Sequence, residues 1–388
     1  MNVQLIKTAH GQPTHGIPHA KTGTCTKPVP VLGGDTVKPS CYRSMYRQIP
    51  IRALLIRATE RILFLIGKFY GIISPDLGGG KDKMNWINSF EILCYAITSV
   101  FLFDIWRKKS RGEFWLFVSA AFAGFALELL AVRVTDIYHY SPDFYISIGF
   151  KPYQFPFFGG LMWGGLTVCS LRIARKLRMG RLMTALIGGW LIVTMDLLLD
   201  VAAIRLNGGF WVWDGREITL DITHHMFMSV IWVNFLGYLF ETPAVLFFYL
   251  RWEEKHKEYP FRKQLFLSLA IGCLGIVFVG AASALALGLN ALTDEWFACI
   301  AFCLLWLYIL VQLLRQIVRL KPGLLSVKEL DLPLLFYWLA MYGYCLVSLC
   351  SLGVAADRPL YYGVGIIFAL GTLYLGSSDI QMRGEETK

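Results

Sequence analysis

Long apolar segments separated by short polar loops dominate the chain from residue 86 to residue 376. Each segment approaches or exceeds the ~20 residues that a helix needs to cross ~30 Å of hydrocarbon. Because lipid offers no partner to backbone N–H and C=O groups, every such segment is predicted to be a helix. The segments occupy residues 86–106, 114–131, 156–174, 183–204, 226–250, 264–290, 297–313, 333–354 and 359–376. The predicted fold is therefore an all-α, polytopic transmembrane helical bundle of about nine spans.

Composition supports this class and argues against a nucleic-acid partner. Of the 388 residues, 56% are hydrophobic and 16% are charged, whereas soluble domains average about 25% charged residues. The net charge of +10 comes largely from short loops between apolar segments, where the bias of membrane proteins toward cytoplasmic Lys and Arg explains it. We therefore expect a multi-pass integral membrane protein, in a bacterial inner membrane or an organelle membrane, whose surroundings are the lipid bilayer.

Loop charges also predict the topology. Basic residues cluster in the loops after the first, third, fifth and seventh segments, at 107–111, 172–181, 251–263 and 315–328. By the positive-inside rule these loops face the cytoplasm or its equivalent. The loops 132–155 and 205–225 then lie on the opposite face of the membrane.

The chain divides into four predicted regions. Residues 1–50 are polar with Asp35 as their only acid, which predicts a disordered tail that is also compatible with a targeting segment. Residues 51–80 combine apolar positions with spaced Arg and Lys, which favours an amphipathic interfacial helix followed by a turn; a soluble capping helix is the alternative. Residues 81–255 form the predicted catalytic membrane region, and 256–388 add transmembrane helices of unknown role.

Acidic and amide side chains lie inside the apolar segments of the third region. Such a group costs roughly 2.5 to 3.5 kcal/mol at the centre of a membrane helix, so it usually marks a functional site or a structural polar pair. Asp196 and Asp200 are four residues apart and share a helix face. With the predicted topology they converge with Glu128 and Asn234 in the half of the bilayer away from the basic loops. Glu241 precedes Pro243 and is interpreted as a kink or interhelical partner.

These groups indicate proton chemistry on an apolar substrate. A buried carboxyl group tends to keep its proton and can act as a general acid. Protonation of an isoprenoid double bond gives a tertiary carbocation, which aromatic faces stabilise by cation–π attraction. Capture of the cation by water gives hydration, and capture by a neighbouring double bond gives cyclisation. The spacing of the residues does not choose between these outcomes, and mutual hydrogen bonding of the polar groups is the structural alternative.

The region also resembles the membrane carotenoid-biosynthesis family that includes the carotenoid 1,2-hydratases of the bisanhydrobacterioruberin hydratase type. The matching elements are Glu128, Tyr138-His-Tyr140-Ser141, Pro156 with Trp163, Asp196 with Asp200, Gly209-Phe-Trp211-Val-Trp213 and Trp232-Val-Asn234-Phe235-Leu-Gly237-Tyr238. The resemblance covers about 86–250. It implies addition of water, without cofactor, across the terminal double bond of a linear carotenoid. Val201 stands where the family pattern has Pro, and the substrate is left open.

Together the residues and the resemblance give a specific hypothesis. The general acid is one of Asp196, Asp200 and Glu128, with Asp200 the first candidate, while Asn234 and Tyr140 position the water. Aromatic groups are expected to line the substrate cavity between spans two to five, namely Tyr138, Tyr140, Trp163, Trp211, Trp213, Trp232 and Phe235. The expected partner is a hydrophobic polyene or isoprenoid, with no metal and no cofactor, and the oligomeric state is not predicted.

Three other functions compete with hydration. A protonation-initiated carotenoid or terpene cyclase would use the same acid. An isoprenoid or lipid transporter or binding protein would use the acids for proton coupling or gating. A prenyltransferase would need paired Asp-rich motifs for magnesium diphosphate, of which the chain offers only the weak Asp196-Leu-Leu-Leu-Asp200.

Overall fold

A computed structural model describes residues 85–134, 138–213, 217–325 and 329–379, all within one compact unit, Arg57–Lys388. The tail and the interfacial helix predicted for residues 1–50 and 51–80 lie outside the described residues.

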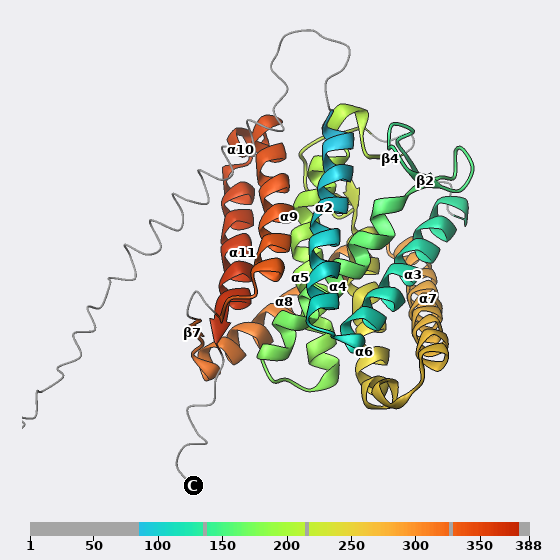
Figure 1. The fold of residues 1–388 in the computed structure, drawn as a ribbon. Coiled ribbons are helices and arrows are strands. Elements are labelled where there is room, and N and C mark those ends of the chain that lie inside the picture. The colour runs from blue at the N-terminus through green and yellow to red at the C-terminus, as the bar shows by residue number, and fades with distance from the viewer. Residues whose placement is uncertain (1–84, 135–137, 214–216, 326–328, 380–388) are drawn as a thin grey trace, which may run out of the picture. The chain divides into compact units, whose positions relative to one another are not determined.

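Within the described part of the chain, nine helices are long and apolar enough to cross a membrane, which confirms the predicted helical bundle. In Figure 1 they follow one another as alternating up and down helices. Their bounds are α2 (Trp86–Arg107), α3 (Arg111–Val134), α4 (Phe157–Lys176), α5 (Arg181–Ala203), α6 (Trp232–Glu258), α7 (Phe261–Leu292), α8 (Trp296–Leu320), α9 (Leu332–Ser351) and α11 (Pro359–Ser377).

Short elements occupy the connections between these helices. Four antiparallel strand pairs join β1 (Tyr138–Tyr140) to β4 (Trp211–Trp213), β2 (Ser147–Ile148) to β3 (Phe155–Pro156), β5 (Met226–Phe227) to β6 (Val230–Ile231) and β7 (Gly323–Leu324) to β8 (Ser378–Asp379). The remaining elements are the 3-10 helix η1 (Leu206–Gly208) and the short helix α10 (Val354–Asp357).

Two of the predicted spans differ from the structure, one at its start and one at its end. Residues 226–231 form the β5–β6 hairpin, because Met228 and Ser229 take positive φ angles of 48° and 70° that a helix does not allow. Asn234 therefore lies in the first turn of α6, whereas a helix that began at residue 226 would place it about two turns from the start. In the eighth span, Gly353 at φ 78° separates α9 from α10.

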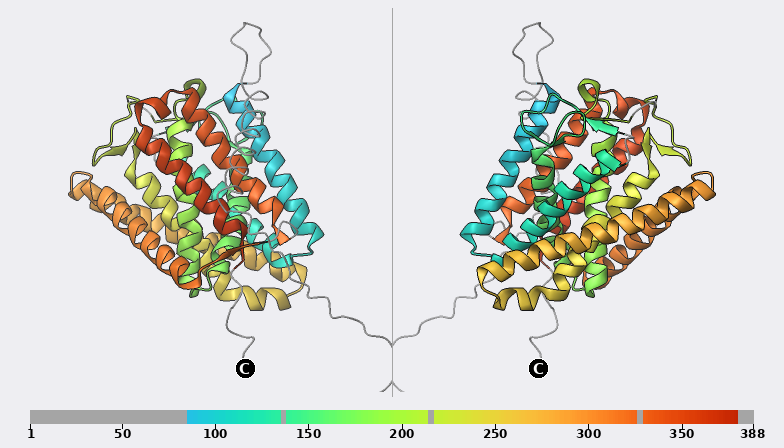
Figure 2. Two further views of the ribbon diagram at one scale, coloured as in Figure 1. Left: turned by 90° about the vertical axis from the view of Figure 1, so that its left-hand side faces the viewer. Right: turned by 90° about the vertical axis from the view of Figure 1, so that its right-hand side faces the viewer.

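The most buried helices are α4 and α5. In each of them 78% of an 18-residue apolar stretch is buried, against 28% in α7 and 22% in α8. On α4, Gly160 and Gly164 face Phe125 and Phe117 of α3 so closely that a side chain at either glycine would collide with the ring. Figure 2 shows α7 and α8 as an inclined pair along the side of the bundle. Because most of their apolar stretches are not buried, these surfaces are available to lipid.

The two ends of the bundle differ in their connections. At one end of the bundle α2 connects to α3, α4 to α5, α6 to α7 and α8 to α9, and Arg and Lys gather in these connections or in the helix turns beside them; we call this the basic end. Most of the strands and the longer connections, between α3 and α4 and between α5 and α6, lie at the opposite end, which we call the loop end (Figure 1).

Candidate active site

Glu128 lies near the loop end of α3 and is the acceptor for three tyrosines. Its side chain is buried, and its Oε2 accepts hydrogen bonds from the hydroxyls of Tyr138 and Tyr140, both at 2.8 Å. A third phenol, Tyr238 of α6, donates to Oε1 at 3.5 Å. Three O–H donors directed at one carboxyl group stabilise negative charge on it.

The β1–β4 pair explains how two of these phenols reach the same carboxyl group. Residues two apart on a strand point to the same face, so Tyr138 and Tyr140 both face α3. The pairing sets Tyr138 opposite Trp213 and Tyr140 opposite Trp211, with ring centroids 5.0 Å and 6.0 Å apart. Burial, together with the nearby Glu128 carboxyl group, raises the pKa of both phenols well above their ordinary value of 10. Both tyrosines therefore stay protonated and remain donors.

Asp196 and Asp200 project from consecutive turns of α5, and both are buried. Asp200 Oδ2 accepts a hydrogen bond from Asn234 Nδ2 of α6 at 2.7 Å. The other oxygen of Asp200, Oδ1, and Oδ2 of Asp196 are buried without a hydrogen-bond partner among the described residues. Asp104 Oδ1 at the basic end is also without a hydrogen-bond partner among the described residues, but it faces the Arg107 guanidinium at 3.6 Å. The oxygens of Asp196 and Asp200 have no such cation, and an unsatisfied buried group of this kind calls for an explanation, for which we consider a functional role.

These acids belong to one group, which also includes Glu241. Asp196 lies close enough to Glu128 and to Asp200 to interact electrostatically with both, and Glu241 interacts with Glu128 and Asp196. We call Glu128, Asp196, Asp200 and Glu241 the carboxyl cluster. Within the described residues no Lys or Arg forms an ion pair with any of its members. Carboxyl groups buried together in a low-dielectric interior without a cation partner are not expected all to be ionised, so we expect the cluster to hold protons.

Two members of the site were not among the residues expected from sequence. Tyr238 reaches Glu128, and the buried Glu241 completes the carboxyl cluster. The signal for both was spacing, because Asn234, Tyr238 and Glu241 recur at intervals of four and three and so share one face of α6.

The predicted aromatic residues fall into two groups. Trp163 of α4 packs on Tyr238 with ring centroids 5.1 Å apart, and Trp211 and Trp213 pack on the β1 tyrosines. Trp232 and Phe235 instead pack on Phe302 of α8, at 5.5 Å and 5.8 Å. The Trp232 indole N–H also donates to the carbonyl of Thr223 at 2.8 Å. The structure thus brings Trp163, Trp211 and Trp213 to the tyrosines around Glu128, and places Trp232 and Phe235 in a distinct aromatic group.

Another buried acid at the loop end serves the fold. Glu91 of α2 accepts hydrogen bonds from the backbone N–H groups of Tyr145 and Ile146, at 2.6 Å and 2.9 Å, and from the Tyr95 hydroxyl at 3.0 Å. It holds the loop between α3 and α4 against α2.

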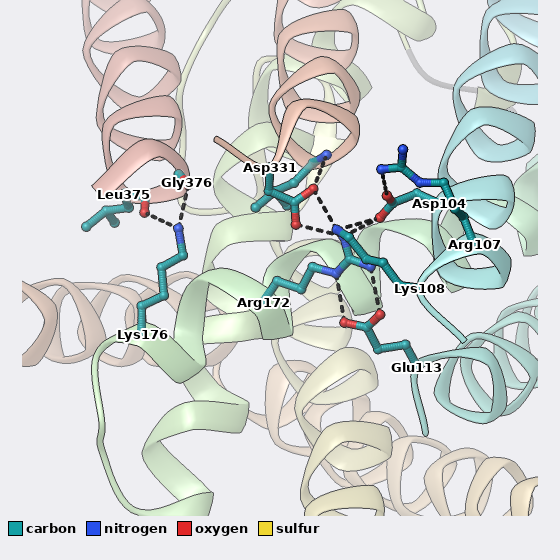
Figure 3. A network of polar contacts seen from close by, with 10 residues as sticks. Asp104, Arg107, Lys108, Glu113, Arg172, Lys176, Asp331, Leu375 and Gly376 are labelled. Carbon is teal, nitrogen blue, oxygen red and sulfur yellow. Dashed lines mark hydrogen bonds and ion pairs between the residues drawn. The ribbon is translucent and has the colours of Figure 1, made fainter. Parts of the chain in front are cut away.

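At the basic end, one arginine of α4 binds three acids. The Arg172 guanidinium of α4 binds both oxygens of Glu113 at 2.7 Å, and it also contacts Asp104 at 3.0 Å and Asp331 at 2.8 Å (Figure 3). Lys108 adds a contact to Asp104 at 2.8 Å. We call these five residues the Arg172 network. It ties α2, α3, α4 and the start of α9 together, and it lies far from the carboxyl cluster.

Comparison with known proteins identifies the family of the chain. The family model described as "Carotenoid biosynthesis protein" matches residues 88–305, which is more than half of the chain. The match extends beyond the region 86–250 of the sequence resemblance, through α7 and into α8, and it includes the whole carboxyl cluster. No match was found among curated proteins or among solved structures. The chain is therefore a multi-pass membrane protein that belongs to the carotenoid biosynthesis protein family.

Proposed function

We propose that the protein adds water across a terminal C=C bond of a linear carotenoid or related isoprenoid. The observation that carries the proposal is the carboxyl cluster: buried acids without a cation partner, two of them with unsatisfied oxygens, beside tyrosine and tryptophan rings. Proton donation to an alkene needs an acid that keeps its proton in an apolar site, and this arrangement supplies one.

The reaction balances without an electron donor or acceptor. A carboxyl group gives its proton to the less substituted carbon of the terminal double bond, which leaves a carboxylate and a tertiary carbocation at the more substituted carbon. Water adds to the cation, and the resulting oxonium loses a proton to a carboxylate of the cluster. The products are a tertiary alcohol and the enzyme with its original number of protons, which agrees with the cofactor-independent hydration that the family resemblance implies.

The contacts support a division of labour within the cluster. Asp200 is the proposed acid, because one of its oxygens is fixed by Asn234 and the other is unsatisfied. Glu128 receives three phenol donors and is the proposed place of the negative charge that faces the cation. Asp196, which interacts with both, is the proposed holder of the water. Asn234 then orients the acid, where the sequence had suggested that it holds water.

The aromatic rings around the tyrosines support the cationic step. Trp163, Trp211 and Trp213 pack on the tyrosines that donate to Glu128. A ring face stabilises a nearby cation by about 0.5–2 kcal/mol, so aromatic rings around the cluster favour a cationic step. Because the substrate dissolves in lipid, we place the reaction in a bacterial inner membrane or an organelle membrane.

The test is expression of the full chain in cells that accumulate lycopene, with an Asp196→Asn/Asp200→Asn double variant as control. Pigment extracts are compared by chromatography and mass spectrometry. A gain of the mass of one water per modified end, absent from the control, is the expected result. A product of unchanged mass would indicate cyclisation in place of hydration. Unchanged lycopene in both strains would exclude lycopene as the substrate.

A further inference from the structure

A groove at the basic end is independent of the carboxyl cluster. It runs between the α2–α3 and α6–α7 turns and has a volume of about 910 Å³, within the range of ligand-binding pockets. Its apolar wall is formed by Leu102, Ile105, Trp106, Phe114, Trp115 and Phe261. Trp106 and Phe261 are 72% and 66% exposed, so their rings are available to a ligand.

The rim of the groove is basic. Arg107, Lys109 and Arg111 line it at the α2–α3 turn, and all are exposed. Arg107 approaches Asp104 at 3.6 Å, but for Lys109 and Arg111 the described part of the chain shows no ion pair. Nearby acids are already engaged: Glu113 binds Arg172, and Glu253 pairs with Arg175 and Lys257.

A polar pocket adjoins the groove. It has a volume of about 340 Å³ and shares Lys109, Ser110, Arg111 and Gln264 with the groove. Long basic side chains and a hydroxyl therefore stand where an apolar channel meets a polar space. An apolar groove that leads to a basic rim and a polar pocket fits a molecule with an anionic head and a hydrocarbon tail.

The position in the membrane favours the same ligand. The basic end faces the cytoplasm by the positive-inside rule, and the cytoplasmic leaflet carries anionic lipids. The exposed Trp106 and Tyr259 lie at this end, and exposed aromatic side chains of membrane proteins prefer the headgroup region.

We propose that this groove binds an anionic phospholipid, with its phosphate between Lys109 and Arg111 and an acyl chain along Ile105, Trp106 and Phe114. Each basic group near the phosphate contributes about 1 kcal/mol of attraction, or about fivefold in affinity. The lipid joins the α2–α3 turn to the start of α7.

The proposal is tested with the purified full-length protein in a mild detergent. Phosphatidylglycerol and phosphatidylcholine of equal chain length are titrated while bound lipids are counted by native mass spectrometry and tryptophan fluorescence is followed. We expect tighter binding of phosphatidylglycerol, and a roughly thirty-fold loss of that binding in Lys109→Gln/Arg111→Gln with phosphatidylcholine unaffected.

The matched control is Arg315→Gln/Arg319→Gln, which removes two exposed charges from α8 at the basic end but outside the groove. It should bind phosphatidylglycerol as the unmodified protein does. Equal binding of the two lipids, an equal loss in the control, or displacement of the lipid by inorganic phosphate alone would each overturn the proposal.

Discussion

Buried acids occur at both ends of the bundle, but the two groups differ in their partners. At the basic end, Asp104 and Glu113 contact Arg172, so each negative charge has a positive partner. At the loop end, the carboxyl cluster has no such partner among the described residues. Helix α3 carries one acid of each kind: Glu113 binds a guanidinium, whereas Glu128, about 22 Å further along, binds phenols.

This difference distinguishes acids that stabilise the fold from acids that we propose to be reactive. A buried ion pair keeps its members charged and its geometry fixed, so the acid has no proton to give. Acids buried together without a cation cost stability and retain protons, and residues of this kind cluster at functional sites. The contrast therefore assigns stability to the Arg172 network and reactivity to the carboxyl cluster.

The largest expected effect is on the rate after Asp200→Asn. Loss of a general acid lowers the rate by about 10²–10⁴-fold, while the amide keeps the shape of the side chain and can still accept from Asn234. Product formation per unit of folded protein, together with thermal melting, measures both properties. Full activity in this variant would remove Asp200 from the acid role.

Asp104→Asn is the matched control at the basic end. It makes the same chemical change in an equally buried aspartate that contacts Arg172 and Lys108. We expect a lower melting temperature and unchanged activity per folded molecule. If both variants lost activity to the same degree, the two ends would not differ in function.

The next largest effect is on stability after Arg172→Met. The change leaves Asp104, Glu113 and Asp331 facing one another without their guanidinium, and breaking a buried pair in this way costs about 3–5 kcal/mol. Chemical denaturation of the purified protein measures the loss. Arg172→Lys should recover part of it, because an ammonium restores the charge but not the two-point contact with Glu113. A stability equal to that of the unmodified protein would show that the network is not structural.

The bundle was predictable because its signals are local. Apolar length alone located nine spans, since lipid forces each apolar segment into a helix. The misplaced start of the fifth span shows the limit of that signal. Residues 226–231 are as apolar as a helix, but they turn at Met228 and Ser229, and a hydropathy pattern does not contain φ angles.

The candidate site was only partly predictable. The predicted topology and the rise per residue of a helix placed Glu128, Asp196 and Asp200 at a similar depth in the membrane. The partners of Glu128 were not foreseen, since they depend on the pairing of β1 with β4 across more than seventy residues. Tyr140 was predicted to position water, and this role stays a prediction. The structure shows that its hydroxyl donates to Glu128, a contact that no local pattern reveals.

The smallest expected effects come from the phenols. Tyr138→Phe and Tyr140→Phe each remove one O–H donor from Glu128. A hydrogen bond of this kind contributes about 1–1.5 kcal/mol. If the charge at Glu128 stabilises the cation, each variant should lower the rate roughly tenfold. Tyr238→Phe should cost less, because its hydroxyl lies 3.5 Å from the acceptor. Tyr95→Phe is the control, since it removes the same group from Glu91, outside the cluster. Initial rates of product formation should fall in the first two variants, less in the third and not in the control. Equal rates in all four would show that Glu128 needs no phenol donors, and the comparison between the two ends would then rest on Asp196 and Asp200 alone.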